Sequence, residues 1–254
     1  MPDPKMPPNL DKAAQRGEPS YVWRAGQERR LDMITTHGGQ SIKGTILVNG
    51  CGIGAYLQRL STQAQQAVGI DIELSRLMIA KEHNDHLICA AGEYLPFKEN
   101  SFHFVLSNEV LEHVADDQAA IHESDRVLKK NGIFILFCPN RGYMFETHGV
   151  FWQGRYHFGN KLFVNYFPKK IRDRLVPHVR VYTRKQLKNL FFYTHLHTMH
   201  HTTIFGAYDN IIHKIPRLGK LIRTSLHFLE KTPLNVFGLS HFWVMKKGTK
   251  KSCD

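Results

Sequence analysis

Short apolar segments alternate with segments of helical periodicity between residues 20 and 140 of the 254-residue chain. Such apolar runs are typical of strands that are buried on both faces of a sheet. They cover residues 45–48, 67–72, 86–91, 102–107 and 133–137. Helical patterns cover residues 21–37, 74–84 and 116–130 and a stretch that ends near residue 60. We expect Ser20 to cap the first helix, and the alternation predicts an α/β, doubly wound, Rossmann-like sheet with helices on both faces.

The pattern becomes looser after Pro139, where residues 140–182 mix aromatic and basic side chains without clean alternation. Helical patterns return over residues 183–192 and 215–231. Strand-like patterns cover residues 196–205 and 238–247. We therefore predict seven strands, mostly parallel, with an antiparallel last strand at or near the edge of the sheet. Residues 140–182 would form a lid insertion after the fifth strand.

The termini and the domain organisation follow from composition. Proline and charge dominate residues 1–18, which predicts a disordered lead-in without the apolar core of a signal peptide. Residues 19–254 would form a single domain. Apolar runs stay well short of the ~20 residues that a membrane-spanning helix needs, so we expect a cytoplasmic protein that is soluble or peripheral to the membrane. Four scattered cysteines fit a reducing compartment.

Charge is distributed unevenly along the chain. Residues 1–139 hold 14 basic and 17 acidic side chains, a net charge of −3, whereas residues 140–254 hold 20 and 5, a net charge of +15. A strongly basic half suits an acidic partner, which can be a phosphorylated substrate, an anionic membrane surface or nucleic acid. A cationic surface that only maintains solubility is the alternative.

A glycine-rich turn follows the first predicted strand in the segment VNGCGIGAYLQRL, residues 48–60. Gly50 and Gly52 allow backbone angles and close approaches that a Cβ atom forbids. Asp71 ends the second predicted strand, 21 residues after Gly50. Backbone N–H groups at the turn and a carboxylate at this distance are suited to a nucleoside-containing ligand. The turn also satisfies G-x-G-x-x-A with Ala55, so a dinucleotide remains an alternative at this point.

Two further segments carry a family resemblance. Residues 92–114 read GEYLPFKENSFHFVLSNEVLEHV and residues 126–132 read RVLKKNG. Together with GCGIG, they resemble class I S-adenosylmethionine-dependent methyltransferases of the subgroup that shares the LPF and EVLEHV motifs. The resemblance covers about residues 21–140 and implies S-adenosylmethionine as the cofactor.

The resemblance also implies roles for individual residues. Gly50, Gly52 and Gly54 would pack under the methionine part of the cofactor. Asp71 would bind the ribose hydroxyls, and Ile72 would lie against the adenine.

The remaining implied contacts lie at the ends of later strands. Ala91, Gly92 and Glu93 would face the adenine edge, and Ser107 with Asn108 would close the pocket near the methyl group. Two positions depart from the family pattern. Asn49 stands where an Asp is usual, although its amide oxygen can still accept a hydrogen bond. Ala91 stands where an Asp often meets the adenine amino group.

Candidate residues for the chemistry lie beyond the fifth strand, where this fold places its acceptor. His148 and His178 are candidate general bases, since histidine titrates near neutral pH. Glu146 and Arg180 are candidate acceptor-binding residues beside them, and His113 in LEHV is a further one. A purely structural role is the alternative for each. A metal is not expected, because the histidine-rich segment of residues 195–201 lacks a nearby acidic or cysteine ligand in sequence.

The sequence therefore predicts transfer of a methyl group to a small-molecule or lipid-linked acceptor by in-line displacement. The aromatic and basic insertion would cover the acceptor or touch an anionic membrane, and RNA is a possible but less favoured partner. Two other functions remain open, an NAD(P)-binding oxidoreductase or epimerase and a non-catalytic nucleoside-binding protein. The acceptor and the oligomeric state are not predicted.

Overall fold

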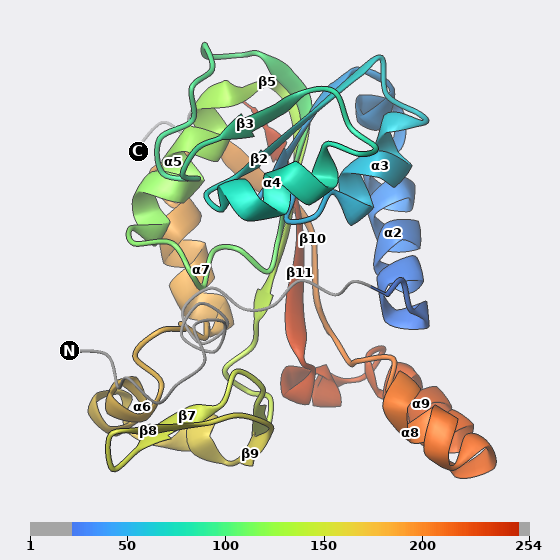
Figure 1. Ribbon diagram of the computed structural model, residues 1–254, viewed down its shortest axis with the longest axis vertical. Coiled ribbons are helices and arrows are strands. Elements are labelled where there is room, and N and C mark those ends of the chain that lie inside the picture. Colours follow the sequence, from blue (N-terminus) through green and yellow to red (C-terminus); the bar gives the residue numbers. More distant parts are fainter. Residues whose placement is uncertain (1–21, 249–254) are drawn as a thin grey trace.

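The computed structural model describes residues 22–248, and the predictions for the lead-in and for Ser20 concern residues outside this range. One seven-stranded sheet runs through the molecule in the order β10-β11-β5-β4-β1-β2-β3 (Figure 1). Its strands are β1 (Thr45–Asn49), β2 (Gln66–Asp71), β3 (Leu87–Cys89), β4 (Phe102–Asn108), β5 (Leu128–Pro139), β10 (Leu196–Ile204) and β11 (Ser240–Lys247).

Strand directions confirm the predicted mixed sheet. The strands β1 to β5 are parallel to one another, and β11 is antiparallel to both of its neighbours, β5 and β10. The last strand of the chain therefore lies one position inside the edge, which β10 forms. Because β10 runs in the same direction as β5, the segments that follow these two strands leave the sheet at the same end.

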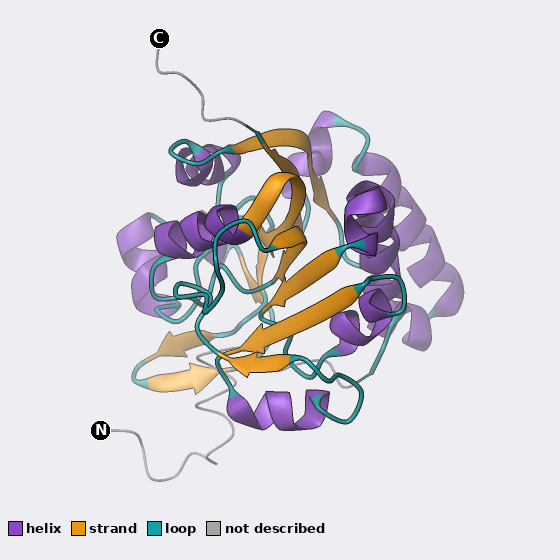
Figure 2. Ribbon diagram, turned by 90° about the horizontal axis from the view of Figure 1, so that it is seen from above, coloured by secondary structure: helices purple, strands orange, loops and turns teal. Residues whose placement is uncertain are grey.

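Helices cover both faces of the sheet, as predicted (Figure 2). Alternate strand residues supply two cores, because successive side chains of a strand point to opposite faces. Leu47, Val105 and Leu136 face α5 and α7, whereas Ile46 and Phe137 belong to the core that includes α2, α3 and α4. The helices and the first 3-10 turn are α2 (Ala25–Gly38), η1 (Gly39–Lys43), α3 (Ala55–Ser61), α4 (Leu74–Ala80), α5 (Asp117–Val127) and α7 (Arg184–Phe191).

Two predicted boundaries are wrong. Residues 22–24 of the helix predicted over residues 21–37 are not helical; α2 begins at Ala25, and its N-cap residue is Arg24, whose backbone N–H donates to the Gln27 side chain at 2.8 Å. The helix predicted over residues 116–130 ends at Val127, and β5 starts at the next residue. Asn131 adopts a left-handed φ of 65° within β5, a conformation that asparagine tolerates well. The strand therefore continues through residues 131 and 132, between the predicted helix and the predicted strand.

The segment after β5, residues 140–182, stands apart from the main sheet and is called the insertion below. It packs around a small core of Val150, Val164, Val176 and Val179. The predicted lid insertion after the fifth strand is thus present as a compact unit. Its elements are β6 (Phe145–Glu146), β7 (Val150–Trp152), β8 (Arg155–His157), β9 (Lys161–Leu162), η2 (Val164–Tyr166) and α6 (Lys169–Leu175).

A second excursion connects β10 to β11. Residues 209–237, called the hairpin below, contain α8 (Asp209–Lys214), α9 (Pro216–Leu229) and η3 (Pro233–Phe237). The helix α9 was predicted, whereas the short α8 was not. In Figure 1 the hairpin and the insertion project at the same end of the molecule, beyond the carboxyl ends of β5 and β10. Within the described range, no helix combines the length and the apolar character needed to cross a membrane.

Candidate active site

A cavity of about 1140 Å³ opens at the carboxyl ends of the parallel strands. Open α/β sheets bind their ligands at this position, where loops leave neighbouring strands in different directions. The walls come from the glycine turn after β1, the ends of β2 and β4, the loop after β3, the insertion and the base of the hairpin. The volume is sufficient for a nucleoside cofactor together with a small acceptor.

The glycine turn forms one wall of this cavity. Gly50 has a φ of 73°, and a Cβ atom added there would lie 2.2 Å from Cγ2 of Val110. Glycine is therefore required by both the backbone angle and the close approach. Gly54 is constrained differently, because its added Cβ would lie 2.6 Å from Nδ2 of Asn84, away from the cavity. Gly50 and Gly52 line the cavity and Gly54 does not.

Asp71 lies at the end of β2 with its side chain almost fully buried at the cavity wall. Its Oδ2 accepts a hydrogen bond from the Gly52 N–H at 2.8 Å, and its Oδ1 accepts one from the Glu73 N–H at 2.9 Å. These bonds fix at the cavity wall a carboxylate, the kind of group that accepts hydrogen bonds from a diol. Ile72 is half exposed and lies in the same wall, where it offers an apolar face.

The loop after β3 places three predicted residues at the cavity. Ala91, Gly92 and Glu93 all line it, and so does Asn49 at the end of β1. A Cβ atom on Gly92 would lie 2.9 Å from Oδ1 of Asn49, so a side chain at residue 92 would collide with Asn49. The Glu93 carboxylate is already engaged, since it accepts a hydrogen bond from the Ala115 N–H at 2.6 Å. Its role within the chain is therefore to hold the loop that follows LEHV.

The end of β4 is held by charges that the sequence analysis did not single out. Arg30 of α2 donates to Oδ1 of Asn108 at 2.8 Å and pairs with Oε1 of Glu109 at 2.7 Å. Burial would raise the pKa of Glu109, but Arg30 and a hydrogen bond from Ser240 keep that pKa below its ordinary value. Asn108 lines the cavity, whereas the buried Ser107, also predicted, does not.

Glu112 is a second missed residue at the cavity. Its side chain is fully buried, and its Oε1 lies 3.9 Å from Nε2 of His113. Burial and the nearby Glu109 raise the pKa of Glu112 well above its ordinary value. Glu109 and Glu112 both belong to the motif EVLEHV, and their spacing of three residues was the available sequence signal. The sequence offered no comparable signal for the ion pair between Arg30 and Glu109, because the two residues lie far apart in the chain.

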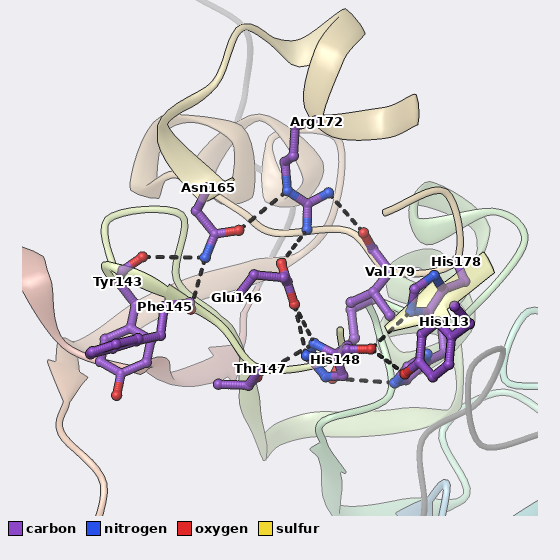
Figure 3. A network of polar contacts seen from close by, with 12 residues as sticks. His113, Tyr143, Phe145, Glu146, Thr147, His148, Asn165, Arg172, His178 and Val179 are labelled. Carbon is purple, nitrogen blue, oxygen red and sulfur yellow. Dashed lines mark hydrogen bonds and ion pairs between the residues drawn. The ribbon is translucent and has the colours of Figure 1, made fainter. Parts of the chain in front are cut away.

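The insertion brings a histidine and a carboxylate together (Figure 3). Glu146 is buried, and its Oε2 forms an ion pair with Nη2 of Arg172 at 3.0 Å. Its Oε1 lies 3.0 Å from Nδ1 of His148 and accepts the His148 backbone N–H at 2.9 Å. Burial opposes ionisation of Glu146, but His148 and Arg172 hold the pKa of its carboxyl below the ordinary value. With Nδ1 engaged in this way, the other ring nitrogen of His148 is available at the cavity, which His148 lines.

Arg172 connects this pair to the rest of the insertion. Its Nη1 donates to the Val179 carbonyl at 2.8 Å, and its Nε donates to Oδ1 of Asn165 at 3.3 Å. Asn165 in turn donates to the carbonyls of Tyr143 and Phe145 at 3.2 and 3.1 Å. The strands and the helix of the insertion therefore meet at a buried polar centre, and His148 is fixed at its edge.

The other predicted residues for the chemistry separate into two groups. His113 lines the cavity, and its ring lies edge-on to that of His148 with centroids 5.6 Å apart. His178 lies behind the cavity wall, with its Nε2 3.3 Å from the His148 carbonyl, and burial lowers its pKa. Arg180 donates to the carbonyls of Val114 and Ala115, so it binds the loop after LEHV rather than facing the cavity.

Three potential metal ligands meet at the cavity, although the sequence analysis expected no metal. Glu112, His113 and His148 each offer a ligand atom, and these atoms lie within 4.8 Å of one another. The histidine-rich segment around β10 is different, because its side chains diverge. His195 bonds with Asp125 at 2.8 Å, and Nε2 of His201 lies 3.2 Å from Nδ1 of His241.

Comparisons with known proteins agree with this geometry. Residues 47–136 match the family model described as a methyltransferase domain. The chain is 32% identical over 122 residues to a ubiquinone biosynthesis O-methyltransferase of Bradyrhizobium diazoefficiens, a match that covers 46% of each chain. It is 35% identical over 108 residues to an uncharacterized protein of Methanocaldococcus jannaschii, which covers 41% of this chain and 51% of that protein. The chain thus spans about half the length, or less, of these curated relatives.

Solved structures extend the similarity in fold over most of the chain. The S-adenosylmethionine dependent methyltransferase from Mesorhizobium loti has a TM-score of 0.61 at 18% identity, and the match covers 87% of this chain and 98% of that one. Residues 47–136 thus match a methyltransferase domain, and the chain has the fold of S-adenosylmethionine-dependent methyltransferases. The fixed Asp71, the glycine turn and the apolar Ile72 fit the cofactor of that class.

Proposed function

We propose that this chain transfers a methyl group from S-adenosylmethionine to a hydroxyl oxygen of a small-molecule or lipid-linked acceptor, with His148 as the general base. The observation that carries this proposal is the contact of the buried Glu146 carboxylate with His148, which lines the same cavity as the glycine turn and Asp71. The choice of oxygen is further supported by the matched relative that is named an O-methyltransferase.

The cofactor, when bound, supplies a methyl group on a positively charged sulfur. The protein must then align the acceptor and remove its proton, and alignment by itself provides a large part of the rate. The free ring nitrogen of His148 would take the proton as the C–O bond forms and the C–S bond breaks. The Nδ1–H group would donate to Glu146, which stabilises the resulting imidazolium, as carboxylate–histidine pairs do in other enzymes. Arg172 keeps Glu146 ionised for this task.

Glu112 is a candidate acceptor-binding residue in this proposal. The raised pKa of the Glu112 carboxyl favours its protonated form, which can donate a hydrogen bond. An acceptor oxygen beside this buried carboxyl group would give it a further hydrogen-bond partner within the cavity. Tyr156 and Phe158 of the insertion also line the cavity and suit an apolar or aromatic acceptor body.

The other functions are less well supported. A nicotinamide-dependent enzyme would not be expected to match the methyltransferase model over residues 47–136. A non-catalytic protein of the same fold would bind S-adenosylmethionine but would not need a histidine whose orientation is fixed by a buried carboxylate. RNA is not favoured as the acceptor, because the lining of the cavity is mainly apolar.

The test combines cofactor binding with methyl transfer. Methyl-labelled S-adenosylmethionine is incubated with fractionated cell extract and the protein, and direct binding of the cofactor is measured by calorimetry. We expect label in the organic phase, and we expect His148→Gln to lose transfer while cofactor binding stays intact. His178→Gln is the matched control behind the cavity wall. Full transfer by His148→Gln would contradict the assignment of the base.

The alternative role for His148 is that of a metal ligand in a metal-dependent reaction. If His148 is a metal ligand together with Glu112 and His113, transfer should stop when a chelator is added and return with a divalent cation. The proposed base mechanism predicts unchanged transfer in the chelator. A reaction that depends on added cation would therefore overturn the general-base role and leave the methyltransferase assignment in place.

A further inference from the structure

The hairpin of residues 209–237 is held to the body at its base. Arg29 of α2 forms an ion pair with Glu230, and Oε1 of Glu230 also accepts the Phe205 N–H at 2.8 Å. Asn140, at the start of the insertion, donates to the Val236 carbonyl at 2.8 Å. The two helices pack closely, since a Cβ on Gly219 would lie 2.7 Å from the Ile212 backbone. The hairpin is thus a fixed projection.

Its outer surface is unusually apolar. In α9, Leu218, Leu221 and Phe228 follow one another at helical spacing and are 48%, 64% and 67% exposed. Ile215 at the junction of the helices is 53% exposed. The 3-10 turn η3 adds three further exposed apolar side chains, Leu234, Val236 and Phe237. Clusters of large exposed apolar side chains on a monomer indicate a surface that is covered in use.

Basic side chains border this apolar surface. Residues 209–237 contain five Lys or Arg side chains and only two acidic ones, and one of the acidic pair is Glu230, which is already bound to Arg29. Lys214, Arg217 and Lys220 are exposed. A helix with an apolar stripe beside a basic stripe, too short to span a bilayer, is the pattern of helices that lie in the membrane interface.

The insertion repeats the pattern on the other side of the cavity. Trp152, Phe158 and Phe163 are 58%, 73% and 50% exposed, and Lys169 with Lys170 begin α6. The cavity is lined by Phe158 from the insertion and by residues 205–207 at the base of the hairpin. Both elements project at the same end of the molecule (Figure 1). The cavity therefore lies between two apolar and basic surfaces.

We propose that the hairpin and the insertion together dock the protein on an anionic lipid bilayer. Apolar side chains would enter the lipid boundary, and the lysines and arginines would meet anionic headgroups. The net charge of +15 over residues 140–254, where both elements lie, complements such a surface. This inference deepens the proposed function, because it names the phase from which a lipid-linked acceptor would reach the cavity.

The test is vesicle co-sedimentation of the whole chain, which requires no turnover and so is independent of the proposed reaction. The probes are vesicles of phosphatidylcholine with and without phosphatidylglycerol. We expect binding to the anionic vesicles only, with a marked decrease at high salt. Leu218→Ser/Leu221→Ser/Phe228→Ser should weaken that binding at least ~10-fold, because three apolar side chains no longer enter the lipid.

The matched control is Leu74→Ser/Met78→Ser in α4, where both side chains are 61% exposed on another face. This control should bind vesicles like the wild type, and both variants should keep the wild-type circular dichroism and cofactor affinity. Equal vesicle binding by the hairpin variant, or no binding by the wild type, would overturn the proposal. A wild-type dimer that the hairpin variant turns into a monomer, without vesicle binding, would assign the surface to a second copy instead.

Discussion

The cavity has two halves that are built by different means. On the side of β1 and β2, backbone atoms do most of the work: the glycine turn approaches closely, and Asp71 is fixed by two backbone N–H groups. On the side of the insertion, side chains meet one another, with Glu146 between Arg172 and His148. The first arrangement suits a constant ligand. The second can be altered one side chain at a time.

The largest expected effect is on the insertion side of this comparison. His148→Gln removes the proposed base, and we expect the transfer rate to fall by roughly 10²- to 10⁴-fold, the usual contribution of a general base. Cofactor affinity should change little, because His148 does not contact the glycine turn. Steady-state kinetics and calorimetry on the same preparation check this. A parallel loss of cofactor affinity would show that the two halves are not separate.

The next effect concerns stability. Arg172→Met leaves the buried Glu146 carboxylate without its cation, and we expect a loss of about 3–5 kcal/mol in the free energy of unfolding. Arg174→Met in the same helix removes an exposed charge and should cost less than about 0.5 kcal/mol. Urea unfolding of both variants gives the comparison. Similar urea midpoints for the two variants would mean that the buried polar centre contributes little to the free energy of unfolding.

On the cofactor side, Asp71→Asn tests the fixed carboxylate. The amide retains one acceptor oxygen but loses the charge, so we expect about a 10- to 100-fold weaker binding of S-adenosylmethionine, equivalent to one or two charge-assisted hydrogen bonds. Calorimetry measures this directly. Asn49→Asp is the opposite change, because it introduces a carboxylate at the position where the family usually has an Asp. Unaltered affinity in Asp71→Asn would remove the ribose contact from the site.

The smallest effect is a pH dependence that is remote from the cavity. Burial and the adjacent His241 lower the pKa of His201 to about 3, and burial lowers that of His241 to about 4. Above pH ~6.5 both histidines are mostly neutral in the folded and in the unfolded chain. As the pH falls below that value, the unfolded chain takes up protons before the folded protein does, so the free energy of unfolding decreases between pH ~6.5 and ~4. His201→Phe should flatten this decrease, while His213→Phe on the exposed side of α8 should not. Unfolding midpoints at several pH values give the slope.

Much of the cofactor side could be predicted from sequence because its signals are local. The strands, the glycine turn and Asp71 at its distance follow from short-range patterns, as does the helix predicted from residue 183, which is α7. Contacts across the chain were not predictable in this way. Arg30 reaches Glu109 across 79 residues, and no periodicity records that pairing.

The insertion shows the same limit more clearly. His148 and His178 look equivalent in sequence, yet only His148 lines the cavity. The difference arises from Arg172, which holds Glu146 and the backbone of Val179 at once and so turns one histidine inward and leaves the other behind. The predicted end of the helix before β5 was wrong because it also depends on a contact between distant residues. That helix ends at Val127, since Leu128 pairs with Phe102 of the neighbouring strand.

The two contacts of the Glu146 carboxylate determine how the protein should respond to heating. Because one oxygen anchors Arg172 and the other orients His148, the same group supports the fold of the insertion and the orientation of the base. The insertion has a small core of four valines, whereas the main sheet has two large ones. On heating, the insertion should therefore loosen before the sheet melts. The proposed methyl transfer would then stop at a lower temperature than the binding of S-adenosylmethionine.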